Sequence, residues 1–251
     1  MNKIALITGG SRGLGRAGAI ALAEQGVDVI FTYQSNQLAA QQVVETIEAL
    51  GQKAVALACD TRDVESFASF AQTLNEVLTK QFGRDSFDYL LNNAGTGLHG
   101  SFEQTTLAEL DEMLTIHIKG PFFLTQTLLP MIAARGHIVN VSTGLTRFTF
   151  PGSAAYAIAK GAVEVMTRYM AKEFAERQIR VNTLAPGAIL TDFRQGAIRN
   201  SEQAQAGVAS VTALGRVGEA EDIGKMIAAM LSDGFTWVTG QRIEASGGMM
   251  L

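Results

Sequence analysis

Tyr156 and Lys160 carry side chains that could act together on one substrate. They lie four positions apart in a stretch, at about 153–176, that we predict to be a helix, so both side chains share one helix face. A phenol with a pKa of about 10 is a poor acid or base at neutral pH, but a neighbouring ammonium stabilises the phenolate and lowers that pKa. The pair therefore predicts proton transfer to or from a substrate. The alternative is an aromatic core residue beside a surface lysine.

A glycine cluster follows the first strand-like run, at residues 4–8. It reads Thr8-Gly9-Gly10-Ser11-Arg12-Gly13-Leu14-Gly15 and leads into an Ala- and Leu-rich helical stretch that ends near Gly26. Glycines at such a turn let the backbone approach a pyrophosphate at a helix N-terminus. The spacing is Gly-x3-Gly-x-Gly, not the commoner Gly-x-Gly-x-x-Gly. The loop therefore predicts dinucleotide binding, but on its own it also fits a plain strand-to-helix turn.

Strand-like and helical stretches alternate along the chain. We predict further strands at 27–32, 54–58, 89–91, 137–141 and 179–184, and helices at about 37–50, 63–81, 107–134 (interrupted near Pro121) and 153–176. This alternation predicts a doubly wound α/β fold, a parallel sheet of about seven strands with helices on both faces. No linker marks a boundary, so we expect one domain over residues 1–251. A polar, glycine-punctuated segment at 188–212 is expected to cover the substrate.

Composition and charge argue against several classes of protein. Hydrophobic residues make up 47% of the 251 and charged residues 18%, which suits a globular protein. The net charge of -4 argues against nucleic acid or a membrane surface as partner. One cysteine and three scattered histidines argue against a metal site. No run approaches the roughly 18 apolar residues of a membrane span and the start does not resemble a secretory signal, so we expect a soluble, cytoplasmic protein.

Four further motifs match one known family in order and spacing. Asn92-Asn93-Ala94-Gly95 follows the fourth strand, Tyr156-Ala157-Ile158-Ala159-Lys160 lies on a helix, Pro186-Gly187-Ala188-Ile189-Leu190-Thr191 ends the sixth strand, and Asp60 closes the third. With the glycine loop, they make the whole chain resemble the short-chain dehydrogenases/reductases, in the branch of the 3-oxoacyl-carrier-protein reductases and carbonyl reductases. The resemblance implies a single-domain Rossmann fold and a nicotinamide-dependent oxidoreductase.

The resemblance also implies which residues bind the cofactor. Asp60 would contact adenine, with a helix N-cap as the open alternative. The backbone of Ile189 and the hydroxyl of Thr191 would hold the nicotinamide carboxamide, and Lys160 would bond the nicotinamide ribose. The expected set is Gly9, Ser11, Arg12, Gly13, Leu14, Gly15, Tyr33, Ser35, Asn36, Asp60, Thr61, Asn93, Ala94, Gly95, Tyr156, Lys160, Pro186, Gly187, Ile189 and Thr191.

The choice between NAD and NADP depends on the end of the second strand. Tyr33 stands where NAD-using members carry a carboxylate for the ribose 2′-hydroxyl, so NAD lacks its usual anchor. Arg12 stands where NADP-using members place a base, and Ser35 and Asn36 could donate to the same 2′-phosphate. NADP is therefore the predicted cofactor. The competing interpretation of Arg12 is a solvated surface residue.

The remaining catalytic positions are less regular. Family members place a carbonyl-polarising serine thirteen positions before the tyrosine, which selects Thr143, whereas Ser142 keeps the usual side chain one position earlier. On this spacing we favour Thr143, and because consecutive strand residues point to opposite faces, only one of the two hydroxyls can face Tyr156. His117 replaces an asparagine that usually supports a water relay to the lysine. It either takes over that role or is a packed helix residue.

The residues expected around the substrate are mainly apolar, which suits a hydrophobic ketone or aldehyde. They are Gly97, Leu98, His99, Leu145, Phe148, Phe150 and Phe193. A 3-oxoacyl chain on a carrier protein is one specific case. Arg168 and Lys172 would then meet the acidic carrier, or are simply solvated.

Small and apolar residues cover nearly every side of the helix at 154–171, and the tail at 247–251 is apolar too. Both predict subunit contacts and a homotetramer. The favoured function is an NADP-dependent carbonyl reductase. An NAD-dependent alcohol dehydrogenase and a dinucleotide sensor without turnover are the alternatives, and the intact Tyr156 and Lys160 argue against the sensor.

Overall fold

One parallel sheet of seven strands organises the protein. The computed structural model describes residues 2–251, and its strands lie in the order β3-β2-β1-β4-β5-β6-β7. This confirms the predicted doubly wound sheet. The strands are β1 (Ile4–Ile7), β2 (Asp28–Tyr33), β3 (Ala54–Ala58), β4 (Phe87–Asn92), β5 (Ile132–Val141), β6 (Arg180–Pro186) and β7 (Arg242–Ala245).

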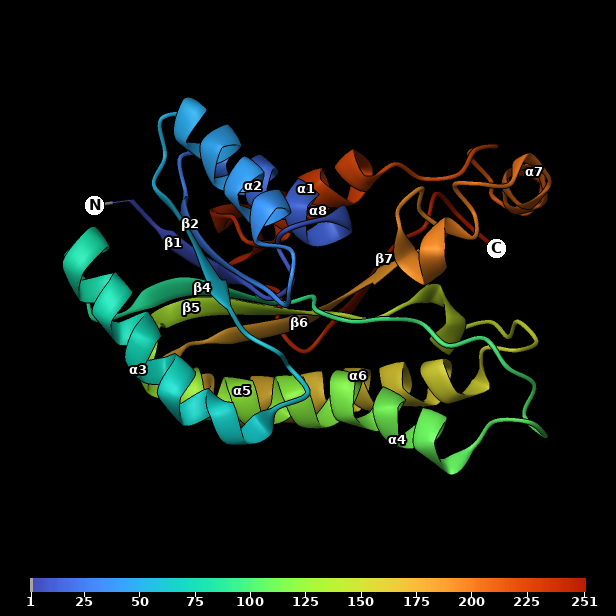
Figure 1. The fold of residues 1–251 in the computed structure, drawn as a ribbon, viewed down its shortest axis with the longest axis horizontal. Helices are drawn as coiled ribbons and strands as arrows, with labels where there is room; N and C mark the ends of the chain where they lie inside the picture. The colour runs from blue at the N-terminus through green and yellow to red at the C-terminus, as the bar shows by residue number, and fades with distance from the viewer. Residues whose placement is uncertain (1) are drawn as a thin grey trace.

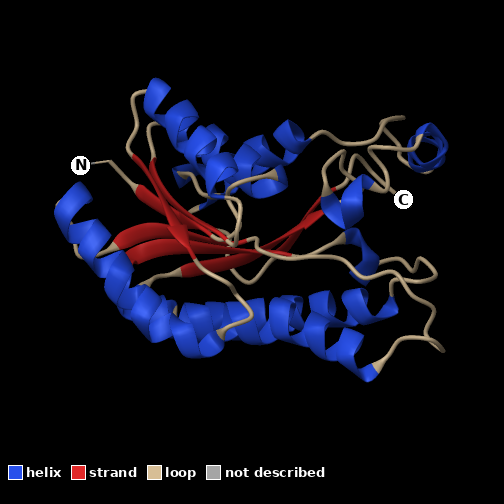
Figure 2. Ribbon diagram, viewed as in Figure 1, coloured by secondary structure: helices blue, strands red, loops and turns tan. Residues whose placement is uncertain are grey.

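Helices cover both faces of the sheet (Figures 1 and 2). One layer holds α1 (Gly13–Glu24), α2 (Gln37–Ala49) and α8 (Ala220–Met230). The other holds α3 (Phe67–Val77), α5 (Gly120–Leu128) and α6 (Ala154–Glu173), with α4 (Leu107–Leu114) beside α6. The short helix α7 (Glu202–Ser210) lies to one side of both layers (Figure 1).

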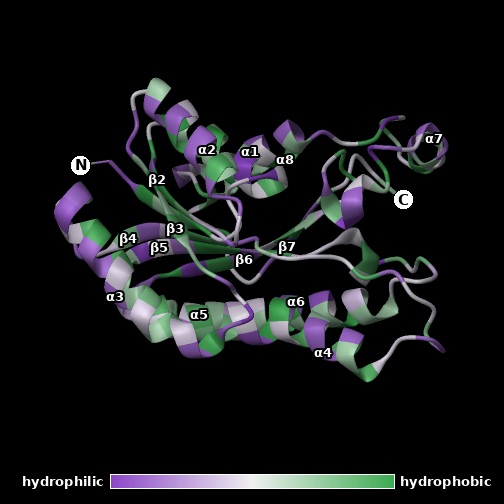
Figure 3. Ribbon diagram, viewed as in Figure 1, coloured by the Kyte–Doolittle hydropathy of each residue, from purple (hydrophilic) through white to green (hydrophobic). Residues whose placement is uncertain are grey.

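The strand sequences are continuous apolar runs because a helix layer buries each face of the sheet. In β1, Ala5 and Ile7 pack toward the layer of α1 and α8, while Ile4 and Leu6 pack toward the layer of α3 and α6. Figure 3 shows the mainly hydrophobic strands at the centre, between helices that carry both hydrophilic and hydrophobic residues. The two hydrophobic cores hold the strands rigidly and so fix the positions of the loops that follow them.

The predicted helix at 107–134 is wrong in its last part. The chain forms α4, a π-helical turn at Thr115–Lys119, and α5, and then a 3-10 turn at Leu129–Met131 leads into β5 at Ile132. Pro130 has no N–H to continue the helix, and Ile132 pairs with Phe87 of β4. Pairing within the sheet therefore decided the structure of residues 132–134.

Two other segments, at 188–212 and at the C-terminal tail, have more local structure than the sequence analysis described. The segment at 188–212 contains a 3-10 turn at Phe193–Gly196 and the helix α7. In the tail, Met249 is buried against its own chain, and only Met250 and Leu251 are exposed.

Within residues 2–251 no helix is both long and apolar enough to cross a membrane. Nor do three acidic, histidine or cysteine side chains of this part of the chain come together as metal ligands.

Candidate active site

The chain order of the sheet reverses between β1 and β4, and such a reversal opens a crevice at the carboxyl ends of the strands. Thr8 closes the base of this crevice. Its hydroxyl accepts hydrogen bonds from the backbone N–H groups of Asn93 and Ala94, both at 2.9 Å. The Asn93 side-chain amide in turn donates to the carbonyl oxygens of Thr8, at 2.9 Å, and Gly9, at 3.1 Å. The glycine loop and the loop after β4 therefore form one unit.

The glycine loop has the shape of a pyrophosphate cradle. Gly9 has a φ of +68°, and a Cβ on Gly15 would lie 2.2 Å from the Gly9 carbonyl oxygen, so neither position accepts a side chain without rearrangement. No side chain caps the N-terminus of α1, which leaves its first N–H groups without a side-chain acceptor. A Cβ on Gly13 would lie 3.9 Å from the side chain of Thr191. The residues of this crevice fit a dinucleotide.

At the end of β2 the side chains are polar, and Gln34 donates to the Asp60 carboxylate, at the end of β3, at 3.1 Å. Asn36 caps α2 through its Oδ1, which accepts from the Ala39 N–H at 2.9 Å, so its NH2 group stays available as a donor. Asp60 binds Arg62 at 2.6 Å, and this pairing lowers the pKa of its carboxyl to about 2. Its Oδ1 accepts from the Arg62 N–H, whereas the following 3-10 helix has Asp63 as its N-cap. The Arg12 side chain is exposed.

Tyr156 and Lys160 are buried side chains on α6, and they lie under the carboxyl end of β5. The Lys160 Nζ donates to the Val141 carbonyl oxygen at 2.7 Å and lies 5.8 Å from the centre of the Tyr156 ring. Burial raises the pKa of Tyr156, and a hydrogen bond with Thr143 partly offsets that shift. Burial also lowers the pKa of Lys160 to about 7.

These directions differ from the expectation that Lys160 would lower the pKa of Tyr156. Removal of both groups from water disfavours their charged forms, phenolate and ammonium, and in this structure that cost outweighs their mutual attraction. The phenol therefore holds its proton at neutral pH. Lys160 can gain or lose a proton there.

The hydroxyls of Ser142 and Thr143 point in different directions. The Ser142 Oγ is buried and donates to the Glu164 carboxylate at 2.8 Å, away from the phenol. The Thr143 hydroxyl accepts from the Leu145 N–H at 3.3 Å and is the one that acts on the pKa of Tyr156. Of the two candidates, only Thr143 shares the space in front of the phenol.

His117 lies in the π-helical turn between α4 and α5, and its ring meets the edge of Tyr156 with centres 5.2 Å apart. Its Nε2 lies 2.8 Å from the Thr96 carbonyl oxygen, and its buried Nδ1 has no partner. Burial, followed by the Lys160 charge, lowers the pKa of His117 to about 2, so the ring is neutral. Gly95 makes room for it, because a Cβ there would lie 2.7 Å from the His117 Cε1.

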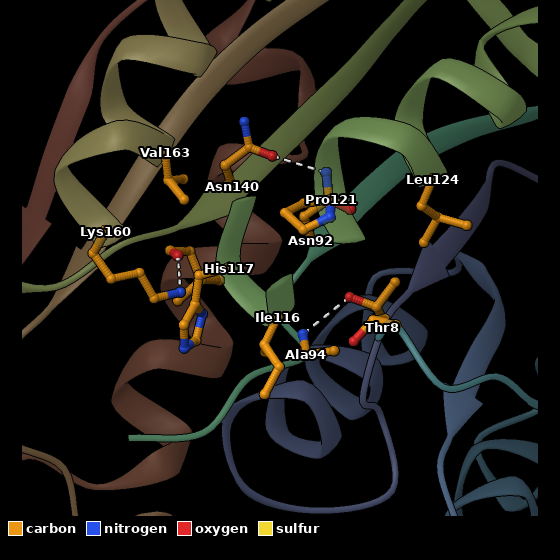
Figure 4. A pocket seen from close by; sticks show the side chains of 12 residues that line it. Thr8, Asn92, Ala94, Ile116, His117, Pro121, Leu124, Asn140, Lys160 and Val163 are labelled. Atoms are coloured by element: carbon orange, nitrogen blue, oxygen red, sulfur yellow. Dashed lines mark hydrogen bonds between the residues drawn. The ribbon is translucent and has the colours of Figure 1, made fainter. Parts of the chain in front are cut away.

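A small cavity connects these groups (Figure 4). Its volume is about 10 Å³, which is about the room that one water molecule needs. His117 and Lys160 lie next to each other on one side of it, and Thr8 and Ala94 lie on another. Asn92 also faces it, and the Oδ1 of this buried amide has no partner. The cavity therefore links the catalytic helix with the glycine loop.

The turn after Thr191 covers the phenol. The Phe193 ring lies 5.8 Å from that of Tyr156, and a Cβ on Gly97 would lie 2.6 Å from the Phe193 Cζ. Leu98 and Leu145 pack against the buried cluster that contains Tyr156. The other expected lining residues lie further out: His99 packs on Gly152, Phe148 packs on Gly144, and Phe150 is 60% exposed.

The sequence analysis missed four charged residues behind Thr143. They are Arg147, Glu164, Arg242 and Glu244. The available signal was weak: Glu164 follows Lys160 by one helical turn, which places it on the same face of α6. Nothing in the sequence indicated that Arg242 of β7 would reach it, or that Glu244 would join Arg242 to Arg147.

A dinucleotide cradle at the switch point of a doubly wound sheet, with a buried tyrosine and lysine beside it, is the site of a nicotinamide-dependent oxidoreductase. The model of the family described as enoyl-(acyl carrier protein) reductase matches residues 9–250. With the relatives that follow, this match shows that the chain belongs to the short-chain dehydrogenase/reductase family.

An uncharacterised oxidoreductase of Methylorubrum extorquens is 37% identical to this chain, over 98% of this chain and 97% of its own length. Among solved structures, the promiscuous reductase LugOII, which catalyses keto-reduction at C1 during lugdunomycin biosynthesis, is 37% identical with a TM-score of 0.93. The match covers 99% of this chain and 98% of LugOII. The angucycline C-6 ketoreductase LanV with bound NADP is 33% identical with a TM-score of 0.93, over 99% and 95% of the two chains.

Proposed function

We propose that this protein reduces a ketone or aldehyde to the alcohol with NADPH as hydride donor. The observation that carries the proposal is the buried Tyr156 phenol, whose pKa Thr143 lowers against the effect of burial and which lies beside Lys160 at the edge of the sheet that also holds the glycine cradle. Keto-reduction by LugOII and the NADP bound to LanV support the same reaction and cofactor.

In this reaction Thr143 would donate a hydrogen bond to the carbonyl oxygen and polarise it. Tyr156 would give its proton to the same oxygen, and its raised pKa keeps that proton in place at neutral pH until charge develops on the oxygen. Lys160, whose pKa is about 7, would then return a proton toward the phenolate. Bound NADPH supplies the hydride to the carbonyl carbon.

The neutral ring of His117 would serve this proton path as a neighbour of the small cavity. Its unpartnered Nδ1 and the unpartnered Asn92 Oδ1 are buried polar atoms that one water in the cavity could satisfy. We therefore assign His117 the support of a water beside Lys160, the role that an asparagine has in other members of the family.

The preference for NADPH would come from Arg12, Ser35 and Asn36. Arg12 can pair with the 2′-phosphate because its guanidinium is exposed at the mouth of the glycine loop. The free NH2 group of Asn36 and the Ser35 hydroxyl can donate to the same group. Tyr33 places no negative charge there, and the nearby Asp60 carboxylate is paired with Arg62.

The substrate would be an apolar carbonyl compound. Leu98, Leu145 and Phe193 surround the phenol, and the segment at 188–212 would close over the substrate through Phe193. We further propose a homotetramer in the cytoplasm. The exposed Ile158, Val165 and Tyr169 on α6 form the apolar face that another subunit would cover.

The test is NADPH oxidation by the purified protein with β-tetralone and with the acetoacetyl thioester of N-acetylcysteamine, each repeated with NADH. We expect turnover that requires the carbonyl compound and is faster with NADPH. Tyr156→Phe is the matched control, because it keeps the ring and removes the proton donor. Oxidation of the corresponding alcohols with NAD, without any reduction by NADPH, would favour the alcohol dehydrogenase instead.

A further inference from the structure

Behind the proposed catalytic hydroxyl, ion pairs join four charged side chains into a continuous chain that runs from α6 toward the C-terminal segment. The chain runs Glu164, Arg242, Glu244, Arg147, with contacts of 2.8, 2.8 and 2.7 Å. None of the four touches the crevice that we assign to the cofactor, and none takes part in the proton path above.

Glu164 is the inner end of this chain. Its Oε1 accepts hydrogen bonds from the Ser142 hydroxyl at 2.8 Å, from the Thr146 hydroxyl at 2.6 Å and from the Arg242 Nε at 2.8 Å. Its side chain is only 15% exposed. An ionised carboxylate can only accept, so one oxygen gathers donors from both sides of Thr143 and from β7.

Arg242 reaches Thr143 itself. Its Nη2 donates to the Thr143 carbonyl oxygen at 3.1 Å, while its Nη1 donates to the Glu244 carboxylate at 2.8 Å. The peptide group of Thr143 is therefore held by the planar guanidinium, whose other two nitrogens are bound to Glu164 and Glu244. A guanidinium fixed at three points has little freedom to move, and neither has the peptide that it binds.

Arg147 joins the outer end of the chain to the C-terminal segment, residues 246–250. It makes a bidentate pair with Glu244, at 2.9 and 2.7 Å. It also donates to the carbonyl oxygens of Met249, at 2.6 Å, and Met250, at 2.9 Å. The Arg147 bond lowers the pKa of Glu244 to about 2, so this carboxylate stays charged at any pH where the enzyme would work.

We propose that Glu164 and Arg242 are positioning residues that hold the Thr143 hydroxyl in place before Tyr156, and that Arg147 and Glu244 extend this support to the C-terminal segment. The inference rests on the proposed function, because it assigns these residues to the hydroxyl that would polarise the carbonyl. The bonds converge on residues 142–146, the end of β5 and the loop that carries Thr143. A displacement of about 1 Å at such a group can cost about 100-fold in rate.

The first experiment compares the steady-state kinetics of Arg242→Met with those of Arg84→Met, using NADPH and β-tetralone. Arg84 is a matched control: it pairs with Asp88 at 2.7 Å, and the exposed fractions are 18% and 5%, against 23% and 15% for Arg242 and Glu164. It lies before β4, at the opposite end of the strands from Thr143. We expect Arg242→Met to lower kcat about tenfold or more and to leave the KM for NADPH within about twofold. Arg84→Met should change neither.

Arg242→Lys should recover part of the lost kcat, because an ammonium can still reach one acceptor but cannot hold three. Glu164→Gln keeps an acceptor oxygen and removes the charge, so we expect a smaller loss of kcat. The double variant with Arg242→Met should lose less than the product of the two single losses, because both changes break the same contact. Equal kcat in Arg242→Met and Arg84→Met would overturn the inference. So would a loss of kcat that is matched by an equal loss of NADPH affinity.

A second measurement does not depend on turnover. Amide hydrogen exchange of residues 142–147 should be about tenfold faster in Arg242→Met and less so in Arg147→Met, with no change there in Arg84→Met. Unchanged exchange in Arg242→Met refutes the positioning role whatever the activity of the parent. If the parent reduces no carbonyl compound but Arg242→Met still exchanges faster, the proposed function is refuted, and the mechanical support of Thr143 remains in place.

Discussion

Thr143→Val should lower activity and change stability little, whereas Ser142→Ala should lower stability and change activity little. Valine keeps the shape of threonine and removes the hydroxyl that acts on the pKa of Tyr156. Loss of one preorganised donor to a developing oxyanion costs about 100- to 1,000-fold in kcat. Within the described residues that hydroxyl makes one hydrogen bond, a 3.3 Å contact from the Leu145 N–H, so the free energy of unfolding should fall by no more than about 1 kcal/mol.

Ser142→Ala removes a different bond. The serine is buried and donates at 2.8 Å to a carboxylate, and such a bond contributes about 1.5–3 kcal/mol to stability. For a chain of this size the midpoint of thermal unfolding should fall by about 3–12 °C. Because Arg242 still binds both Glu164 and the Thr143 carbonyl, we expect kcat to stay within about threefold of the parent value.

The assays are steady-state reduction of β-tetralone at saturating NADPH and thermal unfolding followed by circular dichroism, both on the two variants and the parent. A large loss of kcat in Ser142→Ala with little loss in Thr143→Val would refute the assignment of the polarising hydroxyl. It would mean that the loop rearranges on binding so that Ser142 replaces Thr143 in front of the phenol.

Other perturbations test other parts of the site. Tyr156→Phe should lower turnover by several powers of ten and leave the dissociation constant of NADPH, measured by its fluorescence, nearly unchanged. Lys160→Ala should weaken NADPH binding and turnover together, and an effect on only one would separate its two proposed roles. Arg12→Ala should reduce the ratio of kcat/KM for NADPH over NADH, and Tyr33→Asp should shift it further toward NADH; a parent without preference would show that Arg12 does not bind the 2′-phosphate. Burial holds the pKa of His117 at about 2, against 6.5 when unfolded, so the unfolded state binds more protons as the pH falls below 6.5 and stability declines. His117→Asn should make the loss of unfolding free energy between about pH 7 and about pH 5 smaller by about 2 kcal/mol, as urea denaturation would show; an unchanged pH dependence would mean that His117 is not buried as a neutral ring.

Local patterns were sufficient to predict the fold. Short apolar runs separated by helical stretches can form a parallel sheet only if the helices cross over it, so the strands from Ile4–Ile7 to Arg180–Pro186 could be placed within a few residues. There were two exceptions: no strand was predicted at Arg242–Ala245, which forms β7, and Ile132 was predicted to be helical but pairs with Phe87 in the sheet. The partner of a strand is distant in sequence, so no local pattern records it.

The same distinction applies to the site. The Tyr156–Lys160 spacing and the glycine loop are local, and the structure places them on one helix face and at one strand end. The direction of the pKa of Tyr156 was not predictable, because it depends on how completely the surrounding chain excludes water. Likewise the contact of Arg242 with Thr143 joins residues far apart in sequence. Thr143 follows β5 and Arg242 begins β7, and the two meet because β5, β6 and β7 are neighbours in the sheet.

The most direct test of carbonyl reduction uses NADPH that carries deuterium at the nicotinamide carbon that gives up hydride. The parent protein is mixed with this cofactor and β-tetralone, and the product is examined by mass spectrometry and proton NMR. We predict one deuterium on the carbinol carbon for each NADPH consumed, all of one stereochemistry, because the cradle and Tyr156 hold the two reactants in one orientation. An alcohol without deuterium, or no consumption of NADPH with any carbonyl compound, would contradict the proposed function.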